Sequence, residues 1–501
     1  HTYNPSNSGT TSDPTVSIGA GNDSGPFTRM ISPGGNANNP VLEVTQWGDT
    51  AWTSMSQMFQ NNFNILITAT DSPDLSNCSS MNSMFNNSQN TAICTNGSMN
   101  NWNVSTINNM SAMFNAATGM TADISSWDVS GVLTFANMFG YAYAFNSNIS
   151  NWNVSSCQAF NNMFTHASAF TADIGNWNVS SATNMKDMFT SAGTNSDTTQ
   201  NLSVKVVNSG QASQYLAWYT PLCENFQGTF KNCKYGKTNT DFQNWNVSSA
   251  TNMRQMFDGY PGFNATTDMT PKSVTMGGVT WNAWDTSSVT TFYGFAQNSS
   301  LSQDVSGWDV SAATSLQLMT AATQVNYIFD WTALNNSLTT MNYIFGGSAM
   351  STNNYTDSII HFANLVKNQN PDAPLNVDMG NQLYRFFDTT RTASGFTPAT
   401  AGRARSFLTL DVTVSGGTGV NGVYYYDFAN DKWVKETDST YVIEWNSGES
   451  SWELKYEGST VNAGSGGTQV GGPESSTSWS GGLTVVDSSK GWTISGDTIT
   501  N

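Results

Sequence analysis

The chain has 501 residues and a formal net charge of −18, and only 10% of its residues are charged, against about 25% in ordinary soluble proteins. This balance argues against binding to nucleic acid or to an anionic membrane surface, because both need clustered Lys and Arg. The sequence has no run of about 18 apolar residues, so it predicts no membrane insertion.

A tandem repeat of about 25 residues dominates the chain. Each unit reads roughly F-x-x-x-I-x-x-W-[ND]-V-S-x-x-x-x-M-x-x-M-F, as in residues 149–164 (ISNWNVSSCQAFNNMF). The Trp and Val of a unit are two residues apart and would share one face of a strand. The M-x-x-M-F segment has the i, i+3, i+4 spacing of a short helical turn. The most regular positions are Trp102, Trp127, Trp152 and Trp177, and Phe114, Phe139, Phe164 and Phe189.

In chain order, residues 1–40 are predicted to be an N-terminal β segment. Residues 41–345 are predicted to form a β-rich α/β solenoid of the leucine-rich-repeat type, in which each unit has a strand plus a short helical turn, with an insertion at about 195–225. Bulky residues at helical spacing predict a helical cap and junction at 346–405, because solenoids need capped ends. Short apolar runs between Gly and Asn turns predict an antiparallel β module at 406–501.

Residues 170–189 (FTADIGNWNVSSATNMKDMF) resemble the repeat unit of the BspA-like leucine-rich-repeat surface proteins, FNxDIsxWDVSxVTNMxxMF, and the resemblance covers about residues 40–400. Residues 1–3 (HTY) look like the end of a PKD-like β-sandwich, which often precedes such repeats. Residues 420–426 (VNGVYYY) and 441–452 (YVIEWNSGESSW) look like a small module of secreted and phage proteins. The resemblance implies surface display, adhesion and contact with a host or partner, and it implies no catalytic residues.

We therefore expect a non-enzymatic structural or adhesion protein, located extracellularly on a cell surface or a virion surface, that recognises a cell-surface glycan or protein receptor. The alternative is a virion structural component of a marine-type phage, such as a tail fibre, capsid decoration or receptor-binding protein, with virion partner proteins. Homo-oligomers fit both hypotheses. A glycan-active enzyme is the third hypothesis, but it needs a pair of carboxylates in a cleft, and the acidic residues are sparse and lie mostly in repeat turns.

Two groups of residues are candidates for binding. Side chains beside the inward Trp and Val would form an outward polar ladder, which would either bind glycan hydroxyls or satisfy its own hydrogen bonds and those of the nearby backbone. The C-terminal module has more aromatic residues than a small core needs, and an exposed one would stack on a sugar ring or anchor a partner; the alternative is core packing. The candidates are Asp128, Asn151, Asn153, Asn176, Asn178 and Asn246 in the ladder, and Tyr425, Trp433 and Trp452 in the module.

No cofactor is expected. Asp123 and Asp173 recur at one repeat position, but the sequence has no recognisable calcium-binding loop, which leaves calcium a weak alternative. Residues 417–422 match G-x-G-x-x-G, yet a strand-like run follows them, so they predict a hairpin turn rather than a dinucleotide site. His166 falls in the turn after a repeat Phe and is expected to have a structural or solvent-facing role.

The cysteines fall at small apolar positions of the repeat, which predicts mostly free, buried thiols. Cys78, Cys157 and Cys223 occupy one position, Cys233 occupies a position that is Ala in other units, and Cys94 has no clear place in the pattern.

Overall fold

The computed structural model divides the chain into two compact units, His1–Trp284 and Asp285–Asn501. The N-terminal segment 1–40, Cys94 and most of the predicted cap and junction at 346–405 lie outside the described residues. The described residues are 43–44, 46–89, 93, 97–193, 201–235, 242–263, 268–334, 338, 341, 343–351, five positions between 354 and 365, and the backbone of the strands between 412 and 500.

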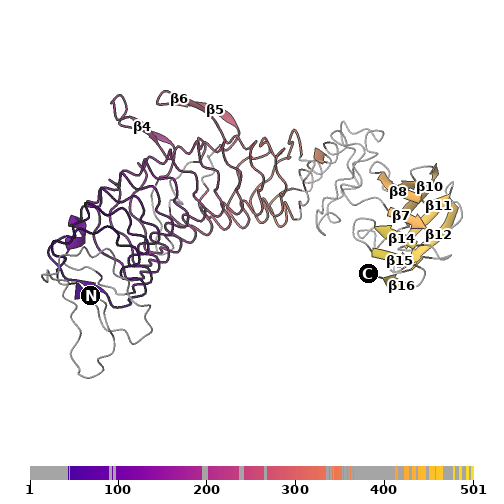
Figure 1. The fold of residues 1–501 in the computed structure, drawn as a ribbon. Helices are drawn as coiled ribbons and strands as arrows, with labels where there is room; N and C mark the ends of the chain where they lie inside the picture. The colour runs from indigo at the N-terminus through magenta and orange to yellow at the C-terminus, as the bar shows by residue number, and fades with distance from the viewer. Residues whose placement is uncertain are drawn as a thin grey trace, which may run out of the picture. The chain divides into compact units, whose positions relative to one another are not determined.

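In the first unit, successive repeats lie side by side (Figure 1) and are joined by isolated parallel bridges. At the start of this series, two short strands, β1 (Glu43–Val44) and β2 (Leu66–Ile67), pair in parallel. One bridge joins Ala51 to Asp74, and from Asn109 to Asn252 the bridges lie after the Trp-x-Val position of the repeat and not at it. The other bridges of this unit join, in order, Ser80, Asn109, Thr134, Ala159, Asn184, Asn225 and Asn252.

The M-x-x-M-F segment is a series of four-residue turns. The N–H of Met113 donates to the carbonyl of Met110 at 3.2 Å, and the N–H of Asn115 donates to the carbonyl of Ala112 at 3.2 Å. Ala112 and Ala116 have left-handed backbone, with φ of 52° and 54°. The N–H groups of alternate residues donate to carbonyls of the next repeat, so this backbone is hydrogen-bonded both within and between repeats. These bonds are Met110 to Thr134 (3.2 Å), Ala112 to Ala136 (2.7 Å), Phe114 to Met138 (2.9 Å) and Ala116 to Gly140 (2.6 Å).

The predicted α/β solenoid of the leucine-rich-repeat type is therefore wrong. Among the described residues between 43 and 349 there is no α-helix, and the single helical segment is the 3-10 helix η1 (Ser98–Asn101). Residues 127–129, expected to form a strand, belong to none. An i, i+3, i+4 apolar spacing fits a helical turn, but it also fits consecutive four-residue turns. The turns form here because their alternate N–H groups bond to the neighbouring repeat.

The core consists of side chains that stack from one repeat to the next. Phe164 lies 5.8 Å from Phe139 and 5.7 Å from Phe189, with rings within 11° of parallel. Trp127 and Trp152 stack at 6.5 Å and 4°. The indole Nε1 of Trp152 donates to the carbonyl of Ile124 in the preceding repeat at 3.2 Å. Trp127, Trp152 and Trp177 therefore fill the apolar column while the one polar atom of each is satisfied by backbone, whereas the buried indole nitrogen of Trp102 has no hydrogen-bond partner among the described residues.

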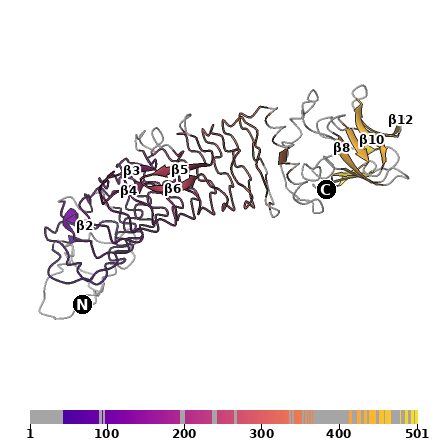
Figure 2. The ribbon, with the colours of Figure 1, turned by 90° about the horizontal axis from the view of Figure 1, so that it is seen from above.

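Two hairpins project from the first unit. β3 (Lys205–Val207) pairs with β4 (Tyr215–Ala217), and β5 (Lys272–Met276) pairs with β6 (Val279–Ala283). Both views place the hairpins beside each other (Figures 1 and 2), and the side-chain amide of Gln214 donates to the carbonyl of Gly277 at 3.0 Å. Trp218 falls inside the expected insertion, but it stacks on Trp245 at 6.2 Å and so occupies the Trp position of a repeat.

In the second unit, parallel bridges join Thr291 to Ser315 and Val310 to Leu334. The described positions of the predicted helical cap, 354, 358, 361, 362 and 365, have helical backbone. The ring of Phe362 is buried and stacks on Trp331 at 5.0 Å and 11°. This segment therefore covers apolar side chains of the last repeats.

The C-terminal strands form one antiparallel sheet with the order β13-β12-β11-β10-β9-β8-β7-β14-β15-β16. Neighbouring strands in this sheet pair antiparallel, as expected for strands that are mostly only a few residues apart in the sequence. The strands are β7 (Val412–Ser415), β8 (Gly422–Asp427), β9 (Lys432–Lys435), β10 (Asp438–Asn446), β11 (Ser451–Tyr456), β12 (Ser459–Ser465), β13 (Ser478–Trp479), β14 (Thr484–Asp487), β15 (Trp492–Ser495) and β16 (Thr498–Thr500).

Candidate binding surface

The predicted polar ladder is made largely of side chains that cap their own turns. At four of the predicted ladder residues, the side-chain oxygen of the residue after the Trp accepts the backbone N–H two residues later, and Asn103, Asp285 and Asp309 do the same in other repeats. This Asx-turn geometry is a common local use of Asn and Asp. The side chains of Asp128 and Asn153 are exposed, that of Asn178 is half-buried and that of Asn246 is buried. The pairs are Asp128 with Ser130 (3.0 Å), Asn153 with Ser155 (3.2 Å), Asn178 with Ser180 (3.1 Å) and Asn246 with Ser248 (3.1 Å).

The remaining ladder residues, Asn151 and Asn176, lie on the other side of each Trp and are exposed. The backbone carbonyl of Asn176 accepts the hydroxyl of Tyr215 in β4 at 2.7 Å, so this position supports the first hairpin. Hydrogen bonding of the ladder to its own backbone is one of the two alternatives left open by the sequence, and it accounts for the turn contacts of Asp128, Asn153, Asn178 and Asn246.

The aromatic candidates of the C-terminal module belong to the second unit, whereas the ladder belongs to the first. In the sheet register, Tyr425 of β8 pairs with Val434, Trp433 of β9 pairs with Tyr426, and Trp452 of β11 pairs with Trp445. Their side chains lie outside the part of the chain that the structure describes. The proposal that they bind a sugar or a partner stays a prediction.

The first unit also has an exposed aromatic cluster that the sequence pattern did not predict. The side chains of Tyr141 and Tyr143 are 43% and 47% exposed, which is unusual for large rings in this chain. The imidazole of His166 stacks on the ring of Tyr141 with centroids 4.7 Å apart and 20° between planes. The ring of Tyr143 stands at 83° to that of Tyr141, with centroids 6.4 Å apart. We call Tyr141, Tyr143 and His166 the aromatic corner.

Two of the three residues of the aromatic corner, Tyr141 and His166, have left-handed backbone. Tyr141 and His166 both have a φ of 58°, and the equivalent positions in neighbouring repeats are Ala116, Ser191 and Asn232, with φ between 50° and 55°. The fold therefore demands positive φ at this position in each of these repeats. Gly and Asn adopt this conformation most easily, and a bulky residue there costs of the order of 1 kcal/mol. Backbone geometry therefore does not favour a tyrosine at position 141.

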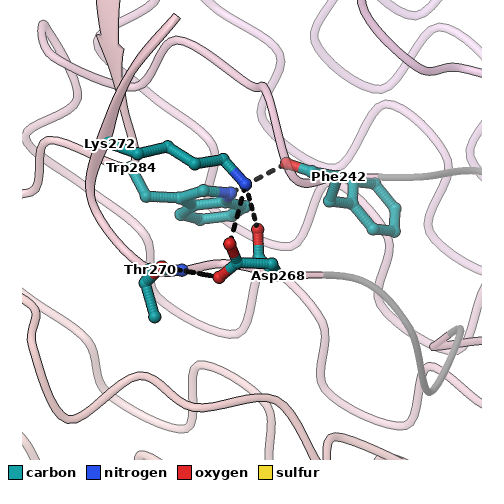
Figure 3. Close-up of polar contacts among 5 residues, drawn as sticks. All are labelled: Phe242, Asp268, Thr270, Lys272 and Trp284. Atoms are coloured by element: carbon teal, nitrogen blue, oxygen red, sulfur yellow. Dashed lines mark hydrogen bonds and ion pairs between the residues drawn. The ribbon is translucent and has the colours of Figure 1, made fainter.

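An ionic contact anchors the second hairpin where β5 begins (Figure 3). The ammonium of Lys272 donates to the carboxylate of Asp268 at 3.0 Å and to its backbone carbonyl at 3.2 Å. The hydroxyl and the N–H of Thr270 also donate to this carboxylate. Beside them, Trp284 Nε1 donates to the carbonyl of Phe242 at 2.8 Å, which ties the end of the hairpin to the repeat that precedes it.

We expect the Asp268→Asn variant to lose stability in a pH-dependent way. The hydroxyl of Thr270, with further help from Lys272, lowers the pKa of Asp268 from 3.8 to about 2. A lowered folded-state pKa adds stability above the unfolded pKa, and this stability is lost as the pH falls through the folded pKa. The stability difference between wild type and variant, measured by denaturant unfolding, should therefore shrink between about pH 4 and about pH 2. In Thr270→Val the pKa of Asp268 should be lowered less, so the pH range over which its stability changes should be narrower. Equal pH profiles for all three proteins would contradict the role of Thr270 and Asp268 in stability.

The cysteine prediction is confirmed for the four described residues. Cys78, Cys157, Cys223 and Cys233 are free and buried. Burial raises the pKa of Cys157 and of Cys223 to about 12. A thiol with so high a pKa is scarcely ionised near neutral pH, so these side chains act as small apolar residues of the core.

Neither a metal cluster nor a membrane span is found among the described residues. They contain no group of three or more His, Cys, Asp or Glu residues that could hold a metal ion. No helix within the described ranges is long and apolar enough to cross a membrane.

These observations define a class of protein built from stacked turns that present side chains at regular corners. The chain matches the family described as "Mycoplasma protein of unknown function, DUF285" over residues 28–93, 79–203, 210–276 and 224–358. These segments together cover more than half of the chain, and the protein therefore belongs to this family. No curated protein and no solved structure matches it. The resemblance to BspA-like proteins, to a PKD-like domain and to a C-terminal phage-type module stays a prediction.

Proposed function

We propose that the protein is a non-enzymatic recognition protein, displayed on an outer surface, that binds a cell-surface glycan or a protein receptor. The observation that carries this proposal is the aromatic corner. Exposed tyrosine rings are among the side chains that contribute most to binding, because they bring a large apolar face and a polar hydroxyl with few rotatable bonds. Here two such rings are held on a rigid stack of turns, and one of them stands where the backbone would favour Gly or Asn.

The composition of the surface supports the same proposal. Charged residues make up only 10% of the chain, so Asn, Ser and Thr supply most of its polar side chains. Association through such a surface depends little on salt, because few charges are screened. Recognition of an uncharged, hydroxyl-rich partner suits this surface better than recognition of a strongly charged one.

The proposal is tested by labelling intact particles with antibodies against the purified chain. Cells and virions from the producing source are labelled before and after disruption, with an antibody to an internal protein as control. We expect labelling of intact particles, and labelling confined to disrupted ones would overturn the proposal. The same experiment separates a cell-surface protein from the alternative, a virion component, by which intact particle carries the label.

A further inference from the structure

We propose that the aromatic corner is a binding site for the pyranose ring of a neutral polysaccharide, which stacks on the open face of Tyr141. This inference rests on the proposed recognition function and gives its chemistry. No charged, metal-bound or covalent step is involved. The site consists of Ala116, Thr118, Tyr141, Tyr143 and His166 from three consecutive repeats.

The first step is the alignment of three residues in one column. The N–H of Ala116 donates to the carbonyl of Gly140 at 2.6 Å, that of Tyr141 to Thr165 at 2.7 Å, and that of His166 to Thr190 at 2.8 Å. These equivalent bonds place Ala116, Tyr141 and His166 at the same corner of successive repeats. Their side chains therefore follow one another along the stack in the order methyl, phenol, imidazole.

The second step is that one face of the Tyr141 ring is covered and the other faces a small residue. His166 covers the face directed to the following repeat, at a ring distance of 4.7 Å. Towards the preceding repeat, the equivalent residue is Ala116, whose side chain is a single methyl group. No third ring fills this place in the column, which we call the open place, and the side chain of Tyr141 is 43% exposed.

The third step is the boundary of this open place. The ring of Tyr143 stands nearly perpendicular to that of Tyr141, so the two rings form two sides of an angle. The side chain of Tyr143 is 47% exposed. Thr118 occupies the position equivalent to Tyr143 in the preceding repeat, because the N–H of Ala144 donates to its carbonyl at 3.1 Å, as that of Ala169 does to the carbonyl of Tyr143. Thr118 therefore stands one repeat before Tyr143, as Ala116 stands one repeat before Tyr141.

The fourth step identifies the occupant by its chemistry. A pyranose ring has a face of C–H groups that is attracted to the electron-rich face of an aromatic ring, and an edge of hydroxyls that need hydrogen-bond partners. The open place supplies the aromatic face of Tyr141, while the hydroxyls of Thr118 and Tyr143 can both donate and accept. These side chains are uncharged, and the net charge of −18 opposes acidic glycans. A neutral sugar therefore fits better than an acidic one.

The experiment is affinity electrophoresis of the full chain in gels that contain laminarin, mannan, galactomannan or xyloglucan, followed by calorimetric titration with the hexasaccharide of any polysaccharide that retards it. We expect at least one of these to retard the wild type. Tyr141→Ala should weaken binding about tenfold, as loss of one stacking contact implies. Tyr141→Phe should keep most of the affinity, because the ring remains.

A second pair of variants tests the open place itself. Ala116→Tyr should extend the ring column into this place and weaken binding about tenfold, while Ala116→Asn, which suits the left-handed backbone and adds no ring, should weaken binding less than Ala116→Tyr does. Tyr343→Ala is the control for loss of an exposed tyrosine, since Tyr343 is 40% exposed with a φ of 55° and lies in the other unit. Thermal unfolding of each variant shows that it is folded.

The outcomes separate the site from the function. Unchanged binding by Tyr141→Ala or by Ala116→Tyr would overturn this site and leave the proposed recognition function standing. Equal losses in Tyr141→Ala and Tyr343→Ala would also overturn it. If none of the four polysaccharides retards the folded wild type, the neutral-sugar proposal is overturned, and labelling of intact particles then decides the proposed function separately.

Discussion

Replacement of Phe164 by alanine is expected to lower the free energy of unfolding by about 3–5 kcal/mol, the usual range for a phenylalanine removed from a packed core. The side chain of Phe164 is fully buried and packs against five other aromatic rings. The rings around it belong to its own repeat and to both neighbours, so the cavity would open at the junction of three repeats. The contacts are Phe139 (5.8 Å), Phe145 (6.4 Å), Phe170 (4.0 Å), Trp177 (6.3 Å) and Phe189 (5.7 Å).

Denaturant unfolding measures the loss, and Phe164→Leu is the control because it keeps most of the volume and should cost less than about 1.5 kcal/mol. In a protein whose repeats contact mainly their neighbours, the damage should stay local. Hydrogen exchange should therefore rise most around residues 139–189 and least around Trp308, in the other unit. A variant with wild-type stability would contradict the ring column as the source of stability.

Replacement of Gly228 by valine is expected to cost about 2–3 kcal/mol, for two separable reasons. Gly228 has a φ of 60°, a conformation that β-branched residues adopt only with strain. A Cβ at this position would also lie 2.0 Å from the side-chain oxygen Oδ1 of Asp187, which occupies the equivalent position in the preceding repeat. Asp187 would have to move away and give up the hydroxyl of Thr190, which donates to it at 3.1 Å.

Two controls divide this loss into its parts. Gly210 has a φ of 76°, but a Cβ added there would meet no heavy atom within 4 Å, so Gly210→Val tests the backbone strain without the contact. Adding Asp187→Ala to Gly228→Val removes the contact and leaves the strain, and the two substitutions should be non-additive by about 1 kcal/mol. Additive losses would show that the side chain of Asp187 does not lie over Gly228.

The repeat and its inward positions could be predicted from the sequence, because Trp, Met, Phe and Cys recur at fixed spacing. Trp127, Phe139 and Cys157 are buried as expected. The backbone conformation could not be predicted. Positive φ is normally signalled by Gly, but here these positions carry Ala112, Asn137 and other residues with side chains, so the spacing of M-x-x-M-F suggests a helical turn.

The candidate site was only partly accessible from the sequence. The N-x-S and D-x-S patterns allow Asx turns as one alternative, and Asp128 and Asn153 do form them. The aromatic corner could not be predicted because Tyr141 and His166 are 25 residues apart and each reads as an isolated turn residue. Only the register between repeats brings their rings to 4.7 Å. A signal is present, since bulky rings occupy the second position after the repeat Phe in these two adjacent units.

The two hairpins show where such a chain can grow. Trp218 follows β4 directly and Trp284 follows β6. The N–H of each donates to the carbonyl of the preceding repeat's tryptophan at 3.2 Å, whereas the N–H of Trp152 donates to Ile149 of its own repeat. Extra residues inserted just before a tryptophan therefore leave the aromatic column unbroken, and lengthening a loop costs only about 0.6 kcal/mol per doubling. The same point of the repeat is therefore a site at which an unrelated peptide can be inserted. A peptide placed between Gly277 and Gly278 would be displayed at the end of the hairpin formed by β5 and β6, while the stacked repeats keep their structure.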